Sequence, residues 1–121
     1  MIKNFETITY ELTDLELEIL PALITGLKTK TKGNPIKAPK ICEGMQLYLK
    51  NNNYKLKFTQ ARLRKMINYI RCESLLPVIA TSKGYYVSYS EQELDAQIES
   101  LVNRANGIMD AARGLKQIKT I

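Results

Sequence analysis

Residues 59–71 carry side chains whose types and spacing suit binding to a nucleic acid duplex. The apolar residues of this segment recur at helical spacing, and they are Leu63, Met66, Ile67 and Ile70. The side chains expected to face away from them are small, amide or basic: Ala61, Lys65 and Asn68 directly opposite, with Arg62 and Arg64 on the two shoulders. Amide and guanidinium groups can pair with purine edges, and basic groups can pair with phosphates. An ordinary solvated helix face is the alternative interpretation.

Other chemistries have little support in the residues present. The chain has no histidine, which removes the commonest general base and metal ligand. It also has no glycine-rich phosphate loop, nucleophile elbow or carboxylate cluster. Cys42 and Cys72 lack metal-ligand spacing; we expect buried or half-buried thiols inside helices, with a redox pair as the alternative. The sequence therefore predicts a protein that is not an enzyme, with no catalytic residue, metal, cofactor or small-molecule substrate.

The charge of the chain is unevenly distributed. Residues 28–83 contain 13 Lys and Arg against two acids, although the net charge of the whole chain is only +6. The flanking segments carry five basic and ten acidic residues. A basic middle is the electrostatic footprint expected of a surface that meets phosphates. For residues 28–37 alone, a solvated lysine-rich loop is the favoured interpretation.

Two helices are predicted upstream of the basic segment. Thr13 and Glu16 form a capping-box pattern at the start of the first, and a stripe of Leu and Ile follows at helical spacing. Pro21 should kink or split this helix, because proline removes a hydrogen bond and crowds the preceding turn. The second helix begins near Pro39 and ends at the polar run 51–53. Residues 54–58 alternate between apolar and basic; we favour an extended connection that places side chains in the core over a strand.

A β-hairpin is predicted directly after the basic helix, which Thr59 caps. β-forming residues flank Ser82-Lys83-Gly84, a turn in which glycine can take a positive φ. Lys83 should lie at the exposed tip, where it can contact a phosphate. Ile36 can add a short third strand.

A long helix is predicted after Ser90, with its end at Gly114. Its apolar residues alternate by four and three, which gives the 3.5-residue repeat of a coiled-coil seam. The seam contains Leu94, Ile98, Leu101, Ala105 and Ile108, and it continues to Ala112 and Leu115. Pairing with a second copy is our preferred interpretation, and docking on the first helix of the same chain is the alternative.

Helix and hairpin together resemble the winged helix-turn-helix superfamily, and most nearly the small winged-helix proteins of phages and prophages that carry a C-terminal helix. Residues 61–71 are similar to the recognition helix of that family, and Ser82-Lys83-Gly84-Tyr85-Tyr86 to its wing. The resemblance covers about two thirds of the chain and implies DNA contacts at Gln60, Arg62, Arg64, Lys65, Asn68, Lys83 and Tyr85. Residues 51–58 form a longer link than the three- or four-residue turn of the simplest motif, which leaves the angle between the second and third helices open.

We therefore expect a mainly α protein with a small β-hairpin (α+β): a winged helix-turn-helix domain at residues 1–89 and a C-terminal packing or dimerisation helix at residues 90–121. The expected function is sequence-preferring binding of double-stranded DNA, as a phage or prophage transcription regulator or a replication-associated factor. A winged-helix module that binds another protein is the alternative, because one fold can serve both uses. We expect no membrane association and a cytoplasmic location, since no apolar run reaches roughly 18 residues and residues 1–6 lack an apolar signal region.

Overall fold

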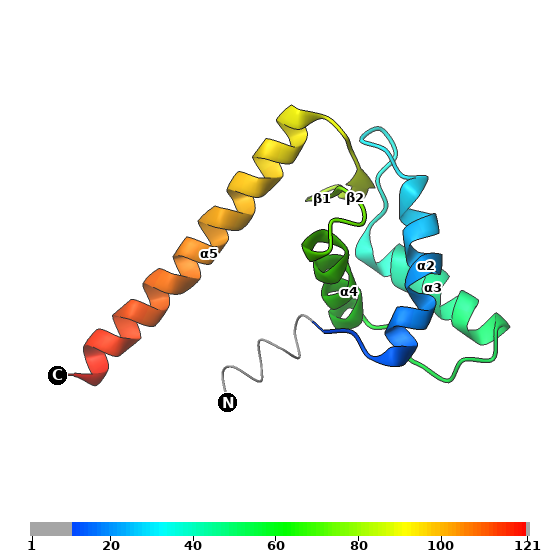
Figure 1. The fold of residues 1–121 in the computed structure, drawn as a ribbon, viewed down its shortest axis with the longest axis horizontal. Coiled ribbons are helices and arrows are strands. Elements are labelled where there is room, and N and C mark those ends of the chain that lie inside the picture. Colours follow the sequence, from blue (N-terminus) through cyan, green and yellow to red (C-terminus); the bar gives the residue numbers. More distant parts are fainter. Residues whose placement is uncertain (1–10, 121) are drawn as a thin grey trace. The chain divides into compact units, whose positions relative to one another are not determined.

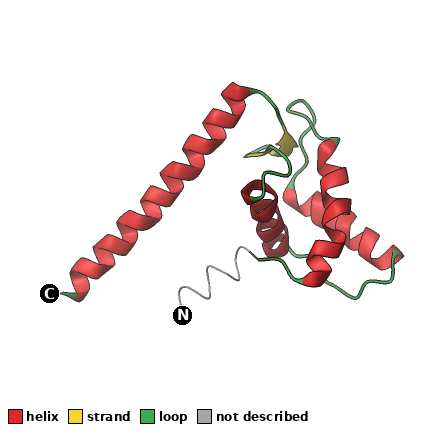
Figure 2. Cartoon of the chain, in the orientation of Figure 1, coloured by secondary structure: helices red, strands yellow, loops and turns green. Residues whose placement is uncertain are grey.

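Three helices, a hairpin and a fourth, long helix follow one another along residues 11–120, the part of the chain that the computed structural model describes. They are α2 (Asp14–Lys28), α3 (Ala38–Asn51), α4 (Gln60–Cys72), β1 (Val78–Thr81), β2 (Gly84–Val87) and α5 (Glu91–Lys119) (Figure 1; coloured by secondary structure in Figure 2). The expectation of a mainly helical chain with one small hairpin is confirmed. The contacts divide the chain into two units at the junction of Ser88 and Tyr89. Residues 1–10 of the expected first domain and Ile121 of the expected second lie outside the described residues.

The start of α2 has the geometry that the sequence predicts. The Thr13 hydroxyl accepts a hydrogen bond from the amide of Glu16, and the Glu16 carboxylate accepts one from the amide of Thr13. The helix then continues without a break through Pro21, so of the two expected outcomes, a kink or a split, the split does not occur. Pro21 and Leu17 are both exposed. Water can therefore reach the Leu17 carbonyl, which Pro21 leaves without its helical donor.

α3 and α4 end in the same way, with a residue in the left-handed region. Asn53 has a φ of 61°, and the amide of Tyr54 donates to the carbonyl of Leu49 at 2.8 Å. Ser74 has a φ of 55°, and the amide of Leu75 donates to the carbonyl of Ile70 at 2.9 Å. Both are Schellman motifs, which satisfy the last carbonyls of a helix and turn the chain sharply.

The link from α3 to α4 is extended and forms no strand, as the preferred interpretation predicts. Phe58 is buried, and Tyr54 and Leu56 are half-buried against the core. The Tyr54 hydroxyl donates to Glu18 of α2 at 2.9 Å, and this bond raises the pKa of Tyr54. The Tyr54 ring also stacks on Tyr48 of α3. The link is thereby attached to both preceding helices.

The core of the first unit is formed by one face of each element. The Thr59 hydroxyl caps α4 by accepting from the amide of Arg62. The expected inner face of α4 is confirmed, since its four apolar residues are at most 2% exposed. These residues pack with apolar side chains of the other elements: Ile19, Leu20, Leu23, Leu27, Ile41, Met45, Leu49, Phe58, Leu76 and Val78.

The β-hairpin lies where the sequence predicts it, and one residue from outside the hairpin pairs with β2. β1 and β2 pair antiparallel, with Thr81 opposite Gly84, so Ser82 and Lys83 form the exposed turn. Ile36, which lies between α2 and α3, pairs with Tyr85 through two backbone hydrogen bonds of 2.7 and 2.9 Å. The expected pairing of Ile36 with the hairpin is therefore present, but as an isolated β-bridge and not as a third strand; it attaches the loop before α3 to β2.

α5 is a single helix of 29 residues with no buried side chain. The Ser90 hydroxyl accepts from the amide of Glu93 and caps its start, as predicted. The predicted end at Gly114 is wrong, because the helix continues to Lys119 and is capped at Thr120. A glycine costs a helix up to about 1 kcal/mol relative to alanine, which is not enough to end one by itself. Across residues 11–120 no helix is both long and apolar enough to span a membrane.

Gly84→Ala should destabilise the first unit by about 2 kcal/mol in urea unfolding of the full chain. Gly84 has a φ of 127°, and a Cβ there would lie 2.6 Å from the carbonyl carbon and oxygen of Ile36. Gly44→Ala in α3 is the control: a Cβ there meets no heavy atom within 4 Å, so we expect up to about 1 kcal/mol of added stability. Equal effects of the two substitutions would contradict the close approach of Ile36 to β2.

Candidate nucleic-acid interface

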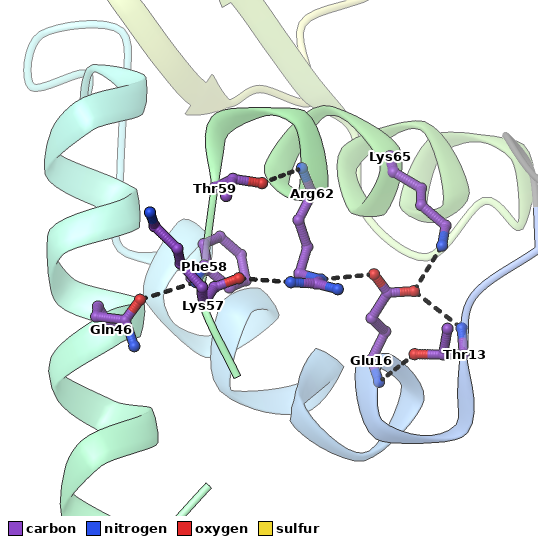
Figure 3. Close-up of polar contacts among 8 residues, drawn as sticks. All are labelled: Thr13, Glu16, Gln46, Lys57, Phe58, Thr59, Arg62 and Lys65. Atoms are coloured by element: carbon purple, nitrogen blue, oxygen red, sulfur yellow. Dashed lines mark hydrogen bonds and ion pairs between the residues drawn. The ribbon is translucent and has the colours of Figure 1, made fainter. Parts of the chain in front are cut away.

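Glu16 is the buried charge around which α2 and α4 are joined. Only 1% of this residue is exposed. Its Oε2 accepts a hydrogen bond from Nε of Arg62 and its Oε1 accepts one from Nζ of Lys65, each at 2.8 Å (Figure 3). The amide of Thr13 donates to the same Oε1 at 2.9 Å. One carboxylate therefore holds two cationic side chains of α4 against the start of α2.

The ion pairs outweigh burial in setting the pKa of Glu16. Burial raises this pKa, because the ionised carboxylate loses hydration on entering the protein. Hydrogen bonds from Lys65, the Thr13 amide and Arg62 lower it, and the result is a pKa of about 2 instead of 4.5. Glu16 is therefore ionised at neutral pH, and removing it would leave two cations without their counter-ion.

Side chains from both neighbouring helices fix the link between α3 and α4. The side chain of Gln46 in α3 forms hydrogen bonds with two backbone groups of the link. Its Oε1 accepts from the amide of Phe58 at 2.8 Å, and its Nε2 donates to the carbonyl of Leu56 at 3.0 Å. Arg62 donates to the carbonyl of Lys57, so one guanidinium contacts both the link and Glu16 (Figure 3). These bonds attach the link to α3 and α4 along its length.

The outward face of α4 presents hydrogen-bonding groups that have no partner among the described residues. Gln60, Ala61, Arg64 and Asn68 are exposed. Within residues 11–120 the side chains of Gln60, Arg64 and Asn68 form no hydrogen bond or ion pair. Burial raises the pKa of the Cys42 thiol on α3, and the charge of Arg64 opposes this rise. The exposed face thus combines two amides, one guanidinium and one small side chain.

Two of the residues expected to face outward on α4 are held by the protein. The expectation that Lys65 points directly away from the core is wrong, because its side chain leans onto α2 and is 22% exposed. Arg62, expected on a shoulder, is 25% exposed and shares the same carboxylate. Since Glu16 neutralises one of these charges and directs both side chains, Arg62 and Lys65 serve first to orient α4.

The hairpin brings one basic residue to its tip. Lys83 is exposed, and the Thr81 hydroxyl organises the turn by accepting from the amide of Lys83 and donating to the carbonyl of Gly84. Tyr85 is half-buried and packs against the core, so most of its ring is not presented outward. Of the two hairpin residues predicted to contact DNA, Lys83 is exposed and Tyr85 is not.

The sequence alone identified the capping role of Glu16 but not its ion pairs with α4, nor the hydrogen bonds of Gln46 to the link or the exposure of Cys72. A signal was present for Glu16, since a charged residue on an apolar helical stripe requires a buried partner. Gln46 carries no such signal, because an exposed amide on a helix looks like any other solvated residue. Cys72 was expected to be buried or half-buried and is exposed, since it lies at the end of α4 on its outward side; Cys42 is half-buried as expected.

Comparison with protein families, curated proteins and solved structures found no match to this chain. The resemblance to winged-helix proteins is therefore an expectation from the sequence.

Glu16→Gln should destabilise the protein at pH 7 by about 3 kcal/mol relative to the native chain, and by about half as much at pH 3. The folded pKa of about 2 lies below the ordinary 4.5. The contribution of the carboxylate is therefore fully present above pH 5 and is lost as the pH falls toward 2. Urea unfolding at several pH values measures the difference.

Glu43→Gln, at an exposed position of α3, is the matched control, and its stability should stay within about 0.5 kcal/mol of the native value at every pH. A Glu16→Gln deficit that does not change with pH would contradict the ion-pair assignment.

Proposed function

We propose that residues 11–88 form a winged helix-turn-helix domain that binds double-stranded DNA, with α4 in the major groove and the turn between β1 and β2 as the wing. The observation that carries this proposal is the outward face of α4, where Gln60, Arg64 and Asn68 are exposed and unused within the described residues. The order of elements supports it as well: two helices, a third basic helix, then a hairpin joined by Ile36.

The proposed mechanism separates the positioning of the protein from the recognition of bases. Lysine and arginine side chains of residues 28–83 neutralise phosphates and supply most of the affinity, without regard to sequence. Arg64 can donate two hydrogen bonds to a guanine, and Gln60 or Asn68 can pair with an adenine edge. Lys83 adds a phosphate contact from the wing. Arg62 and Lys65, which the resemblance placed among the DNA contacts, act mainly by holding α4 at the angle that presents these three side chains.

The proposed biological role is that of a regulator or replication-associated factor that acts without catalysis, in keeping with the resemblance to small phage and prophage proteins. The competing function is a module that binds another protein. The exposed face of α4 favours DNA, because it has no apolar centre of the kind that protein interfaces usually have, whereas its guanidinium and amide groups can pair with base edges. An absence of DNA binding in the next experiment would favour the protein-binding function.

The protein should bind mixed-sequence duplex DNA with an affinity that falls steeply with salt. If four to six phosphates are engaged, a plot of log K against log salt concentration should have a slope of roughly −3.6 to −5.4, because bound counterions are released. Fluorescence anisotropy of a labelled duplex between about 50 and 200 mM salt measures the slope. No binding at about 50 mM would overturn the proposal.

Arg64→Ala and Asn68→Ala should reduce discrimination between DNA sequences by about 1–3 kcal/mol each, because each removes a paired contact to a base edge. Lys83→Ala should weaken binding to all sequences alike and make the salt slope shallower by about 1. Selection from a random duplex pool, followed by titration of the best and a scrambled site, measures both effects. Lys28→Ala, at an exposed position outside α4 and the hairpin, is the control and should leave discrimination unchanged. If Arg64→Ala and Asn68→Ala behave like Lys28→Ala, α4 is not the recognition element.

A further inference from the structure

α5 carries an apolar stripe that its own unit cannot cover. The unit that begins at Tyr89 contains one helix, and no side chain of that helix is buried. The stripe includes large apolar residues that are more than half exposed: Ile98, Val102, Ile108, Met109, Leu115 and Ile118. Apolar surface of this kind along a helix of 29 residues marks an interface.

The charges of α5 are divided between its two halves. Residues 91–103 contain four acids and no Lys or Arg, whereas residues 104–119 contain four Lys and Arg and one acid, Asp110. Asp110 is paired with Arg113 of the same helix. A second α5 in parallel would place four acids beside four acids. An antiparallel second copy would place the acidic half of each helix beside the basic half of the other.

The sizes of the seam residues also favour opposite directions. In a parallel pair each seam residue faces its own copy, so Ala105 and Ala112 would form two layers that contain only methyl groups and leave gaps. In an antiparallel pair one register places Ile98 opposite Leu115, Leu101 opposite Ala112 and Ala105 opposite Ile108. The four central layers then each combine one large and one small side chain, which fills the seam evenly.

The same register brings a carboxylate to an ammonium group on the border of the seam. Asp95 follows Leu94, and Lys116 follows Leu115, so both residues border the same side of the stripe. When the helices run in opposite directions, that side of one helix faces the same side of the other. Asp95 of each copy then lies beside Lys116 of the second copy, and Val102 lies beside Met109.

From these observations we propose that α5 pairs with α5 of a second copy of this chain as an antiparallel two-helix coiled coil, in the register that joins Asp95 to Lys116. The pairing does not depend on DNA binding by the first unit. In this register Leu94 lies opposite Lys119, so the two Leu94 residues are separated by 25 residues of helix, or about 38 Å at 1.5 Å per residue. A parallel pair would bring them to about 10 Å.

Sedimentation equilibrium of the full chain at low salt tests this proposal through a charge exchange. The native chain should be a dimer at tens of micromolar. Asp95→Lys and Lys116→Asp should each weaken the dimer roughly tenfold, because each replaces two attractive pairs with two repulsive ones. The double variant, Asp95→Lys with Lys116→Asp, should return to within about threefold of the native dissociation constant. An equimolar mixture of the two single variants should also pair, since each repulsive site then meets its opposite charge.

The control is Glu99→Lys, which makes the same change of charge in the acidic half but at a position away from the seam. It should alter the dissociation constant by less than about threefold. Circular dichroism shows whether each variant keeps its helix. A native chain that is monomeric at about 100 µM overturns the proposal and assigns the stripe to its own chain. A dimer in which the double variant is no tighter than the single variants overturns the antiparallel register, because in a parallel pair residues 95 and 116 lie about 32 Å apart and cannot compensate each other.

Discussion

The arrangement of the first unit depends on one buried carboxylate. An ionised Glu16 is costly to bury unless it is paired and hydrogen-bonded, and Arg62, Lys65 and the Thr13 amide meet that requirement together. Since Arg62 and Lys65 lie three residues apart on α4, their shared attachment point on α2 restrains the rotation of α4 about its own axis. The opposite shoulder, with Gln60 and Arg64, and the outward residue Asn68 are exposed to solvent. An interaction that binds no ligand thus determines which side chains are available to bind one.

The link between α3 and α4 shows how a long connection can be as well defined as a tight turn. A Schellman motif with Asn53 ends α3, Phe58 enters the core, and Gln46 supplies hydrogen bonds to two backbone groups of the link. Arg62 completes the arrangement by contacting the link and Glu16 with the same guanidinium. Each attachment reduces the number of conformations open to the link, whose length alone would allow many angles between α3 and α4. Together the attachments couple the positions of α2, α3 and α4.

The two units differ in how their apolar side chains are covered. Residues 11–88 bury an apolar face from each helix and from the hairpin in a common core. α5 has an apolar stripe of comparable regularity but no partner within its unit, and its acidic and basic halves cannot neutralise each other along one straight helix. In the proposed antiparallel pair, the apolar stripes of two copies cover each other, and the acidic half of each α5 lies beside the basic half of the other.

The sequence by itself determined the features that depend on neighbours three or four residues apart. The caps at Thr13, Thr59 and Ser90, the buried face of α4 and the turn before Gly84 all follow from local hydrogen bonding and helical or hairpin periodicity. Tertiary structure decided which charges meet, because nothing local connects Lys65 to a carboxylate 49 residues earlier or Gln46 to the backbone at position 58. The end of α5 is also a local feature that the sequence analysis misplaced, since the residues after Gly114 continue the helix to its cap at Thr120. Local patterns fix elements and their faces, whereas the partners of exposed polar side chains depend on how the elements pack.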